Sequence, residues 1–189
     1  LYDRQRKQYQ IARQNVQIIN RKCHELKVQI ADLRRLQPDE ATTRSLDEAE
    51  QAARMYDANA ATGNEVLDVV LTEKSLLCEA QRIRLNCVAD GTCLAAIEPG
   101  DLYALFSNLL DQAIDAAAQQ QNDRRMIDLL VCRRQGFTVI NIIAPVVTEA
   151  PARAARQHNY ELKVMRRIVQ KYNGTMTTEN QNVLSAVKI

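Results

Sequence analysis

Residues 16–33 read VQIINRKCHELKVQIADL and belong to a largely apolar seven-residue repeat. The a and d positions of this heptad are occupied by Tyr2, Gln5, Tyr9, Ala12, Val16, Ile19, Cys23, Leu26, Ile30 and Leu33. Because neither Gly nor Pro interrupts the repeat, it predicts one long helix with a coiled-coil seam. Pro38 ends the pattern, and a second repeat follows through Leu46, Ala49, Ala53, Tyr56 and Ala60. The two repeats predict an antiparallel helical hairpin, and two hairpins joined through residues 1–60 predict a homodimeric four-helix bundle.

The sequence changes character after Gly63-Asn64. Helical spacing of apolar residues predicts helices over 64–82, 101–120 and 160–172, the last ended by Asn173-Gly174. Alternating or continuous apolar runs predict strands over 83–87, 126–133 and 137–143, and a strand pair within 175–189. Residues 145–159 are polar and Ala-rich, which indicates a loop or a weak helix. The order of elements predicts an α+β fold in which the helical hairpin precedes an α/β sandwich.

Composition sets limits on the kind of site. With 189 residues, 46% hydrophobic and 25% charged, the chain has enough apolar material for one or two small folded domains. Its 5 glycines are scattered, which excludes a GxGxxG or P-loop phosphate-binding loop. The 5 cysteines are odd in number and show no CxxC spacing, so neither a disulfide framework nor a zinc site is expected. We expect a reducing, cytoplasmic setting.

Charge gives weaker indications about partners. The net charge of +2 favours neither nucleic acid nor a membrane surface. The first 37 residues are basic, but the apolar seam runs straight through them, unlike the separate basic region of a DNA-binding zipper. No nucleic-acid partner is therefore expected. The chain starts at Leu1 within the heptad pattern, so we expect a fragment of a longer protein. Arg4, Arg6 and Lys7 would fit the cytoplasmic flank of a preceding membrane segment.

Two groups of residues are candidates for chemistry. His24 takes heptad position b, facing water beside the seam, where its imidazole can accept an incoming group with Glu25 adjacent. The alternative is a solvated surface histidine. Asn108, Gln112 and Asp115 share one face of an otherwise apolar helix at spacings i, i+4 and i+7. They either point into a pocket or form a partly exposed amphipathic surface.

Four segments together resemble the sensor histidine kinases of the peptide quorum-sensing receptor type, within the GHKL ATPase superfamily. Thr62 to Asp68 with Lys74 is similar to the TGNxxLD…K signature, and Asn108 to Ala116 is similar to the N-box. Met165 to Gly174 is similar to the helix and turn after the glycine box, and His24 to Lys27 is similar to the H-box. The four segments occur in the family's order and span almost the whole chain.

The resemblance implies a hairpin domain over residues 1–61 and a Bergerat-type catalytic domain over residues 62–189. It implies that ATP, with Mg²⁺, phosphorylates His24, that Glu25 activates this histidine, and that a response regulator then receives the phosphoryl group. Asn108, Gln112 and Asp115 would contact the nucleotide, and Gln112 would take the place of the magnesium ligand. The parent protein would be anchored in a membrane, with this portion in the cytoplasm.

Three features depart from the family pattern. Gln112 is one methylene longer than the usual Asn, whereas Mg²⁺ demands near-octahedral geometry. The glycine box, usually HGLGL, reads HNYEL over residues 158–162, which places Glu161 near the expected phosphates. The DxGxG loop has no counterpart. We therefore expect impaired nucleotide binding, and the alternative is a pseudokinase that acts as a dimerising scaffold. A third possibility is that a partner kinase subunit phosphorylates His24 in a heterodimer.

Overall fold

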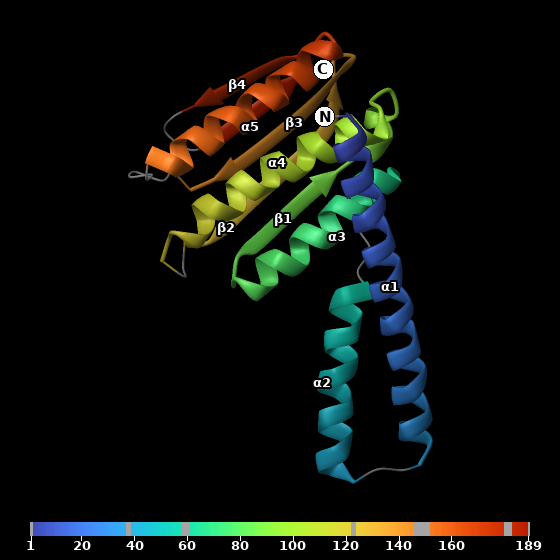
Figure 1. The fold of residues 1–189 in the computed structure, drawn as a ribbon. Helices are drawn as coiled ribbons and strands as arrows, with labels where there is room; N and C mark the ends of the chain where they lie inside the picture. Colours follow the sequence, from blue (N-terminus) through green and yellow to red (C-terminus); the bar gives the residue numbers. More distant parts are fainter. Residues whose placement is uncertain are drawn as a thin grey trace.

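The protein, represented by a computed structural model, is described over residues 2–36, 39–57, 61–121, 124–145, 152–179 and 183–188. A helical hairpin precedes a sandwich of one sheet and three helices (Figure 1). In chain order the elements are α1 (Tyr2–Arg35), α2 (Glu40–Asp57), α3 (Glu65–Ala80), β1 (Arg84–Ala89), the short 3-10 helix η1 (Gly91–Leu94), α4 (Pro99–Ala118), β2 (Met126–Arg134), β3 (Phe137–Ala144), α5 (Ala152–Lys171), β4 (Thr175–Glu179) and β5 (Val183–Lys188). The predicted α+β class is confirmed.

Helices α1 and α2 form the hairpin and run antiparallel (Figure 1). Cys23 and Ile30 are buried on α1, as are Leu46 and Ala53 on α2. Arg34 ties the two helices together through ion pairs with Asp47 and Glu50 of α2. Among the described residues, no helix combines the length and the apolar character needed to cross a bilayer.

The predicted seam of α1 divides into two parts within one chain. Because α2 has 18 residues against 34 in α1, it accompanies only the C-terminal part of the longer helix. Ala12 and Val16, in the N-terminal part, are buried in the core of the sandwich instead. The d-position residues Leu26 and Leu33 stay 40% and 49% exposed. One continuous heptad therefore serves two packing partners and leaves part of its apolar side chains uncovered.

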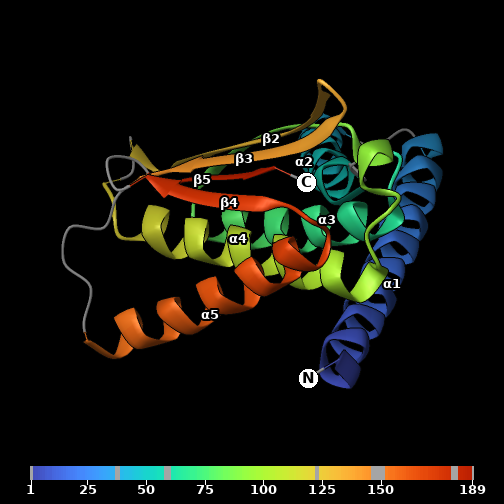
Figure 2. The ribbon, with the colours of Figure 1, turned by 90° about the horizontal axis from the view of Figure 1, so that it is seen from above.

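The sheet has the strand order β1-β2-β3-β5-β4. Strand β1 runs parallel to β2, and the other neighbours pair antiparallel. Helices α3, α4 and α5 lie on the same side of this sheet (Figure 2). The predicted hairpin between β2 and β3 is confirmed, and its turn residues Gln135 and Gly136 have φ angles of 50° and 84°. Two consecutive positive φ angles are typical of the tight turns that match strand twist.

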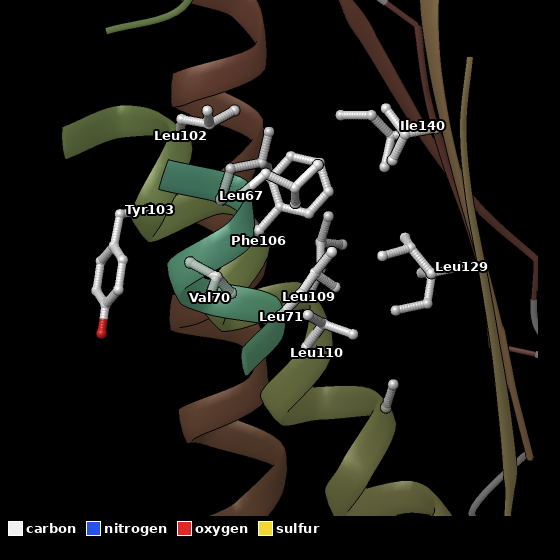
Figure 3. Close-up of a cluster of buried hydrophobic side chains, with 14 of the residues drawn as sticks. Leu67, Val70, Leu71, Leu102, Tyr103, Phe106, Leu109, Leu110, Leu129 and Ile140 are labelled. Atoms are coloured by element: carbon white, nitrogen blue, oxygen red, sulfur yellow. The ribbon is translucent and has the colours of Figure 1, made fainter. Parts of the chain in front are cut away.

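The core fills the space between the helices and the sheet. Alternate strand residues, including Leu129 of β2 and Ile140 of β3, face Phe106 and Leu109 of α4 (Figure 3). Tyr103 lies on the opposite side of α4, turned away from the sheet (Figure 3). Helix α4 therefore presents one face to the core and another to the outer side of the helical layer, where the site lies.

The segment from Thr62 to Asp68 builds the start of α3. The Asn64 side chain accepts hydrogen bonds from the backbone N–H groups of Val66 and Leu67, at 3.1 and 3.2 Å, which caps the helix. Asp68 accepts from both the backbone N–H and the hydroxyl of Thr62, at 2.9 and 2.7 Å. The TGNxxLD pattern therefore has a structural explanation in this chain: its polar side chains form hydrogen bonds with one another and with the backbone at the start of α3.

Helix α5 is longer than the prediction of 160–172. It begins at Ala152, so of the two alternatives for residues 145–159, a loop or a weak helix, the structure has a helix from residue 152 onward, while residues 146–151 lie outside the described part. Ala-rich segments have high helix propensity, which accounts for the extension. The C-terminal end agrees with the prediction, since Asn173 has φ 56° and the Gly174 N–H bonds to the Val169 carbonyl at 2.9 Å.

Candidate functional site

A pocket of about 860 Å³ opens on the outer side of the helical layer, where α1, α3, α4 and α5 meet. This volume lies within the range of small-molecule sites. Its walls are formed by Arg4, Gln5, Gln8, Ile11, Ala12 and Asn15 of α1, Glu73 and Lys74 of α3, Tyr103, Ala104, Ser107, Asn108 and Asp111 of α4, and Tyr160, Glu161 and Val164 of α5.

The three polar residues predicted on α4 are placed differently. Asn108 lines the pocket. Gln112 is only 8% exposed, and its side-chain amide donates to Glu161 Oε2 at 3.3 Å. Asp115 is exposed and does not belong to the pocket walls. The shared face of α4 therefore brings one of its three residues to the pocket, while the second is held beneath α5.

A buried ammonium group belongs to the pocket wall. Lys74 is 6% exposed, and its Nζ lies 2.7 Å from Asp111 Oδ1 and 3.9 Å from Glu73 Oε1. Burying a lysine is costly unless its charge is compensated, so this pairing stabilises Lys74 in the wall. Ser107 adds a longer hydrogen bond to Asp111, at 3.4 Å.

Carboxylates dominate the part of the pocket contributed by the sandwich. Glu73, Asp111 and Glu161 line it together with the ammonium of Lys74. The same crowding acts on nearby Asp115, whose pKa is raised by burial first and then by the negative charges of Asp111 and Glu161. This wall is therefore unfavourable for an anion unless positive charge comes from elsewhere.

Tyr103 connects the pocket to α1. Its hydroxyl donates to Glu73 Oε2 at 3.1 Å, and its ring centroid lies 5.8 Å from that of Tyr9. Burial, followed by the charge of Glu73, raises the pKa of Tyr103 well above its ordinary value. Tyr103 and Glu73 were not predicted from the sequence. Tyr103, Ser107 and Asp111 are spaced four residues apart, so they form a polar stripe along one face of α4. This stripe is the sequence pattern from which Tyr103 could have been predicted.

His24 lies apart from this pocket. It is exposed on α1, nine residues beyond Asn15, which corresponds to about 13 Å along the helix and about half a turn around it. Glu25 accepts a hydrogen bond from Lys22 at 2.7 Å. That hydrogen bond, and then the positive charge of Lys22, lowers the pKa of Glu25. The proposed phosphoacceptor and the pocket are thus not brought together within this chain.

The region of the expected glycine box forms part of the pocket rim. Tyr160 is 57% exposed and, with Glu161, lines the opening from α5. The side chains of His158 and Asn159 lie outside the described ones, as do residues 146–151. With respect to the described side chains, the pocket beside Asn108 is therefore open, and Tyr160 lines it rather than filling it.

The residues present do not fit a magnesium ion. Within the described part of the chain, no group of three or more His, Cys, Asp or Glu side chains is arranged to hold a metal. Gln112, in the place of the expected ligand, is engaged with Glu161, and Asp111 is engaged with Lys74. Mg²⁺ prefers several oxygen ligands in strict octahedral geometry, which this set does not offer.

Part of the chain is similar to a known protein family. Residues 97–189 match the family described as the GHKL domain. No curated protein sequence matches the chain. Among solved structures, the chain is similar to the histidine kinase AdeS of Acinetobacter baumannii, with 17% identity and a TM-score of 0.48 over 88% of this chain and 96% of that one. The matched residues 97–189, which contain α4, the hairpin of β2 and β3, and α5, are thus similar to the GHKL domain family.

Proposed function

We propose that this chain is the signalling core of a two-component sensor of the histidine kinase type, with impaired nucleotide binding. In this proposal residues 62–189 form the ATPase-like domain, and residues 1–61 form a dimerising hairpin with His24 as phosphoacceptor. The observation that carries the proposal is the open pocket beside Asn108, formed in part by the segment that matches the GHKL domain.

The exposure of His24 supports its role as acceptor. A neutral imidazole nitrogen can attack the γ-phosphorus of ATP, so that an N–P bond forms as the bond to the bridging oxygen breaks and ADP leaves, and the proton of the ring is then lost to a base. Glu25 is the neighbouring candidate for that base, but its carboxylate is paired with Lys22 at 2.7 Å. For Glu25 to accept the proton, the ion pair with Lys22 must open, which is a small change on an exposed helix face.

The position of His24 restricts how the phosphoryl group can reach it. About 13 Å of helix separates His24 from the last pocket residue of α1, and the two point to opposite sides. Transfer therefore requires the sandwich to move relative to α1, or it takes place from the pocket of a second copy in the homodimer.

Nucleotide binding is expected to be weak. The pocket is large enough for an adenine nucleotide, and Asn108 offers an amide in its wall. Against this, three carboxylates, those of Glu73, Asp111 and Glu161, line the pocket, and Gln112 donates its amide to Glu161. Since the residues do not fit magnesium, we assign no step to that ion.

The contact between Gln112 and Glu161 favours a second candidate function. If this hydrogen bond persists, α4 and α5 remain joined beside the pocket, and the Gln112 amide, in the place of the expected magnesium ligand, stays engaged. The chain would then be a pseudokinase, a scaffold that dimerises and transmits a signal without catalysis. A response regulator as partner, and a membrane-anchored parent with this portion in the cytoplasm, belong to both candidates.

The decisive experiment combines calorimetric titration with labelling. We expect ATP to bind with a dissociation constant of about 0.1–1 mM, equivalent to roughly 4–5.5 kcal/mol of binding free energy. Incubation with γ-phosphate-labelled ATP should label wild type and the His158→Gln control, but not His24→Gln.

Absence of both binding and label would favour the scaffold. Micromolar affinity together with label on His24 would exclude it. Label that appears on His24 only when a competent partner kinase is added would instead support phosphorylation within a heterodimer.

A further inference from the structure

The N-terminal part of α1 is firmly attached to the sandwich. Ala12 and Val16 are 6% and 7% exposed and belong to its hydrophobic core. The Tyr9 ring packs against Tyr103, with the ring planes inclined at 52°, and Arg13 forms an ion pair with Glu65 of α3 at 2.7 Å. Apolar burial and two specific contacts together hold this part of α1 against α3 and α4.

This attached segment also forms one wall of the pocket. Arg4, Gln8, Ile11 and Asn15 follow one another at spacings of three or four residues, so they lie on one face of α1. Three of the four carry hydrogen-bonding side chains, and Arg4 adds a guanidinium group. The hairpin therefore contributes a polar wall with one positive charge to the pocket, in addition to the wall of the sandwich.

The balance of charge in the pocket depends on this wall. The sandwich contributes three carboxylates, and its one ammonium group, that of Lys74, is buried against Asp111. Within the described part of the chain, Arg4 is exposed and makes no ion pair. Arg4 is thus the cation in the pocket wall that is available to a ligand.

We propose that Arg4 receives the anionic end of the ligand, so that the ligand site is shared between the hairpin and the sandwich. This inference rests on the proposed function, in which the ligand is an adenine nucleotide. Guanidinium groups bind phosphate oxygens through paired, charge-assisted hydrogen bonds. The phosphates lie against α1, away from Glu161, while the remainder of the nucleotide lies along α4 beside Asn108.

A shared site couples ligand binding to the docking of α1. A ligand that contacts both walls binds more tightly when α1 is attached, and by linkage it strengthens that attachment to the same degree. A signal that enters through the helical hairpin can then change occupancy of the pocket, and occupancy can act back on the hairpin.

The test is titration of ATP, without added metal, into the full chain and its variants by calorimetry. Arg4→Glu should weaken binding about tenfold, because it removes a charge-assisted contact and adds a repulsive charge. Arg6→Glu is the matched control, since Arg6 has the same charge on the same helix and lies outside the pocket walls. It should change affinity by less than about twofold, as expected of exposed charges away from a site.

Hydrogen exchange separates a shared site from a distant electrostatic effect. Saturating ATP should slow exchange of the amides of residues 4–15 in wild type and in Arg6→Glu, but not in Arg4→Glu. Asn108→Ala serves to locate the ligand. If Asn108→Ala weakens binding while Arg4→Glu and Arg6→Glu behave alike, the assignment of Arg4 is wrong and the proposed function stands. If wild type shows no binding at all, both the nucleotide site and the role of Arg4 are refuted.

Discussion

Gly91 lies where the loop before α3 meets the start of η1. Its backbone N–H donates to the Thr62 carbonyl at 2.8 Å. A Cβ atom at this position would lie 2.6 Å from Thr62 Oγ1 and 2.7 Å from Asn64 Cβ. The side chain of Asn64 is itself occupied in capping α3. The absence of a side chain at Gly91 thus allows the capping loop to approach η1.

Gly91→Ala should therefore destabilise the fold. We expect the free energy of unfolding to fall by about 1–3 kcal/mol, as for other overpacked sites. Gly100→Ala is the control, because a Cβ there meets nothing within 4 Å and alanine favours the first turn of α4. Its effect should stay within roughly 0.5–1 kcal/mol, toward stabilisation. Urea unfolding followed by circular dichroism measures both. Equal midpoints for the two variants would refute the steric account.

Cys78 gives the fold a dependence on alkaline pH. Its side chain is 1% exposed on α3, and burial raises the pKa of this thiol from 9.0 to about 11, partly offset by Lys74. The folded chain thus keeps the thiol proton at a pH where the unfolded chain has lost it. This contribution to stability is complete below about pH 9 and is lost as the pH rises toward 11.

Cys78→Ala should accordingly flatten the pH profile. Between pH 9 and 11, the free energy of unfolding should decline more steeply in wild type than in the variant. Cys132→Ala, which removes a thiol that is only partly buried, should keep the slope of the wild type. Chemical unfolding at several pH values provides the measurement. Parallel profiles for wild type and Cys78→Ala would show that this thiol is not responsible.

At the scale of elements, a polar cluster joins the start of α4 to the end of α5. Asp101, 4% exposed, accepts hydrogen bonds from Lys171 Nζ at 2.7 Å and from the Tyr172 hydroxyl at 2.8 Å. The same hydroxyl accepts from the Glu98 backbone N–H at 3.0 Å. The hydrogen bonds to Asp101 and then Glu98 raise the pKa of Lys171 above its ordinary value. The cluster fixes the two helices that border the pocket.

Tyr172→Phe should loosen this connection. Without the hydroxyl, the buried carboxylate of Asp101 and the backbone N–H of Glu98 each lose one hydrogen-bond partner, at a cost of about 1–3 kcal/mol. Tyr160→Phe removes a hydroxyl from α5 itself at a position that is 57% exposed, and should change stability by less than about 0.5 kcal/mol. Thermal unfolding should show a lower midpoint for the first variant alone. A similar shift in both would indicate a general effect of losing a tyrosine.

Individual elements could be predicted where one local signal dominated. The heptad of α1, the turn at Gln135-Gly136 and the end of α5 at Asn173 each follow from spacing or backbone preference, and each is confirmed. The start of α5 was placed too late, because its polar N-terminal turns lack the apolar periodicity that marks a packed helix. Apolar periodicity in a sequence indicates which face of a helix is buried. A helical segment that is stabilised mainly by helix propensity shows little of this periodicity.

At the scale of the whole molecule, α1 presents an uncovered apolar stripe. Ile18, Leu26 and Leu33 are 50%, 40% and 49% exposed. Their spacings of eight and seven residues place them within about a quarter turn of one another on the helix. Neither α2 nor the sandwich covers this stripe in one chain. It is the surface we expect at the centre of the proposed homodimer.

The double variant Ile18→Asp, Leu26→Asp should yield a monomer. Two charges in an apolar helix interface leave unpaired charges in a buried seam, which weakens dimerisation by several kcal/mol, or a factor of about 10³ in the dissociation constant. Ala31→Asp is the control, since Ala31 is exposed but lies on the other side of α1. Size-exclusion chromatography with light scattering gives the masses. A dimer that survives the double variant would place the interface elsewhere.

The candidate site could be predicted only in part. Asn108, Gln112 and Asp115 were correctly assigned to one helix face, but only Asn108 reaches the pocket. A helix face spans a wide arc, and what covers each part of it depends on neighbours distant in the chain. Here α5 brings Glu161 over Gln112, 49 residues away, which no local pattern reports. The roles of all three, and of His24 and Glu25, remain predictions, as does the domain boundary at residues 61 and 62.

The sequence by itself determined the helical hairpin, the α+β order of elements and the likeness to GHKL proteins, because these depend on local periodicity, turn residues and short motifs. Only the tertiary structure decided how the seam of α1 divides between α2 and the sandwich. It also decided that Lys74 lies buried against Asp111, and that α1 forms a wall of the pocket. These depend on which elements meet in space, and a side chain's charge and exposure are settled by the groups packed around it.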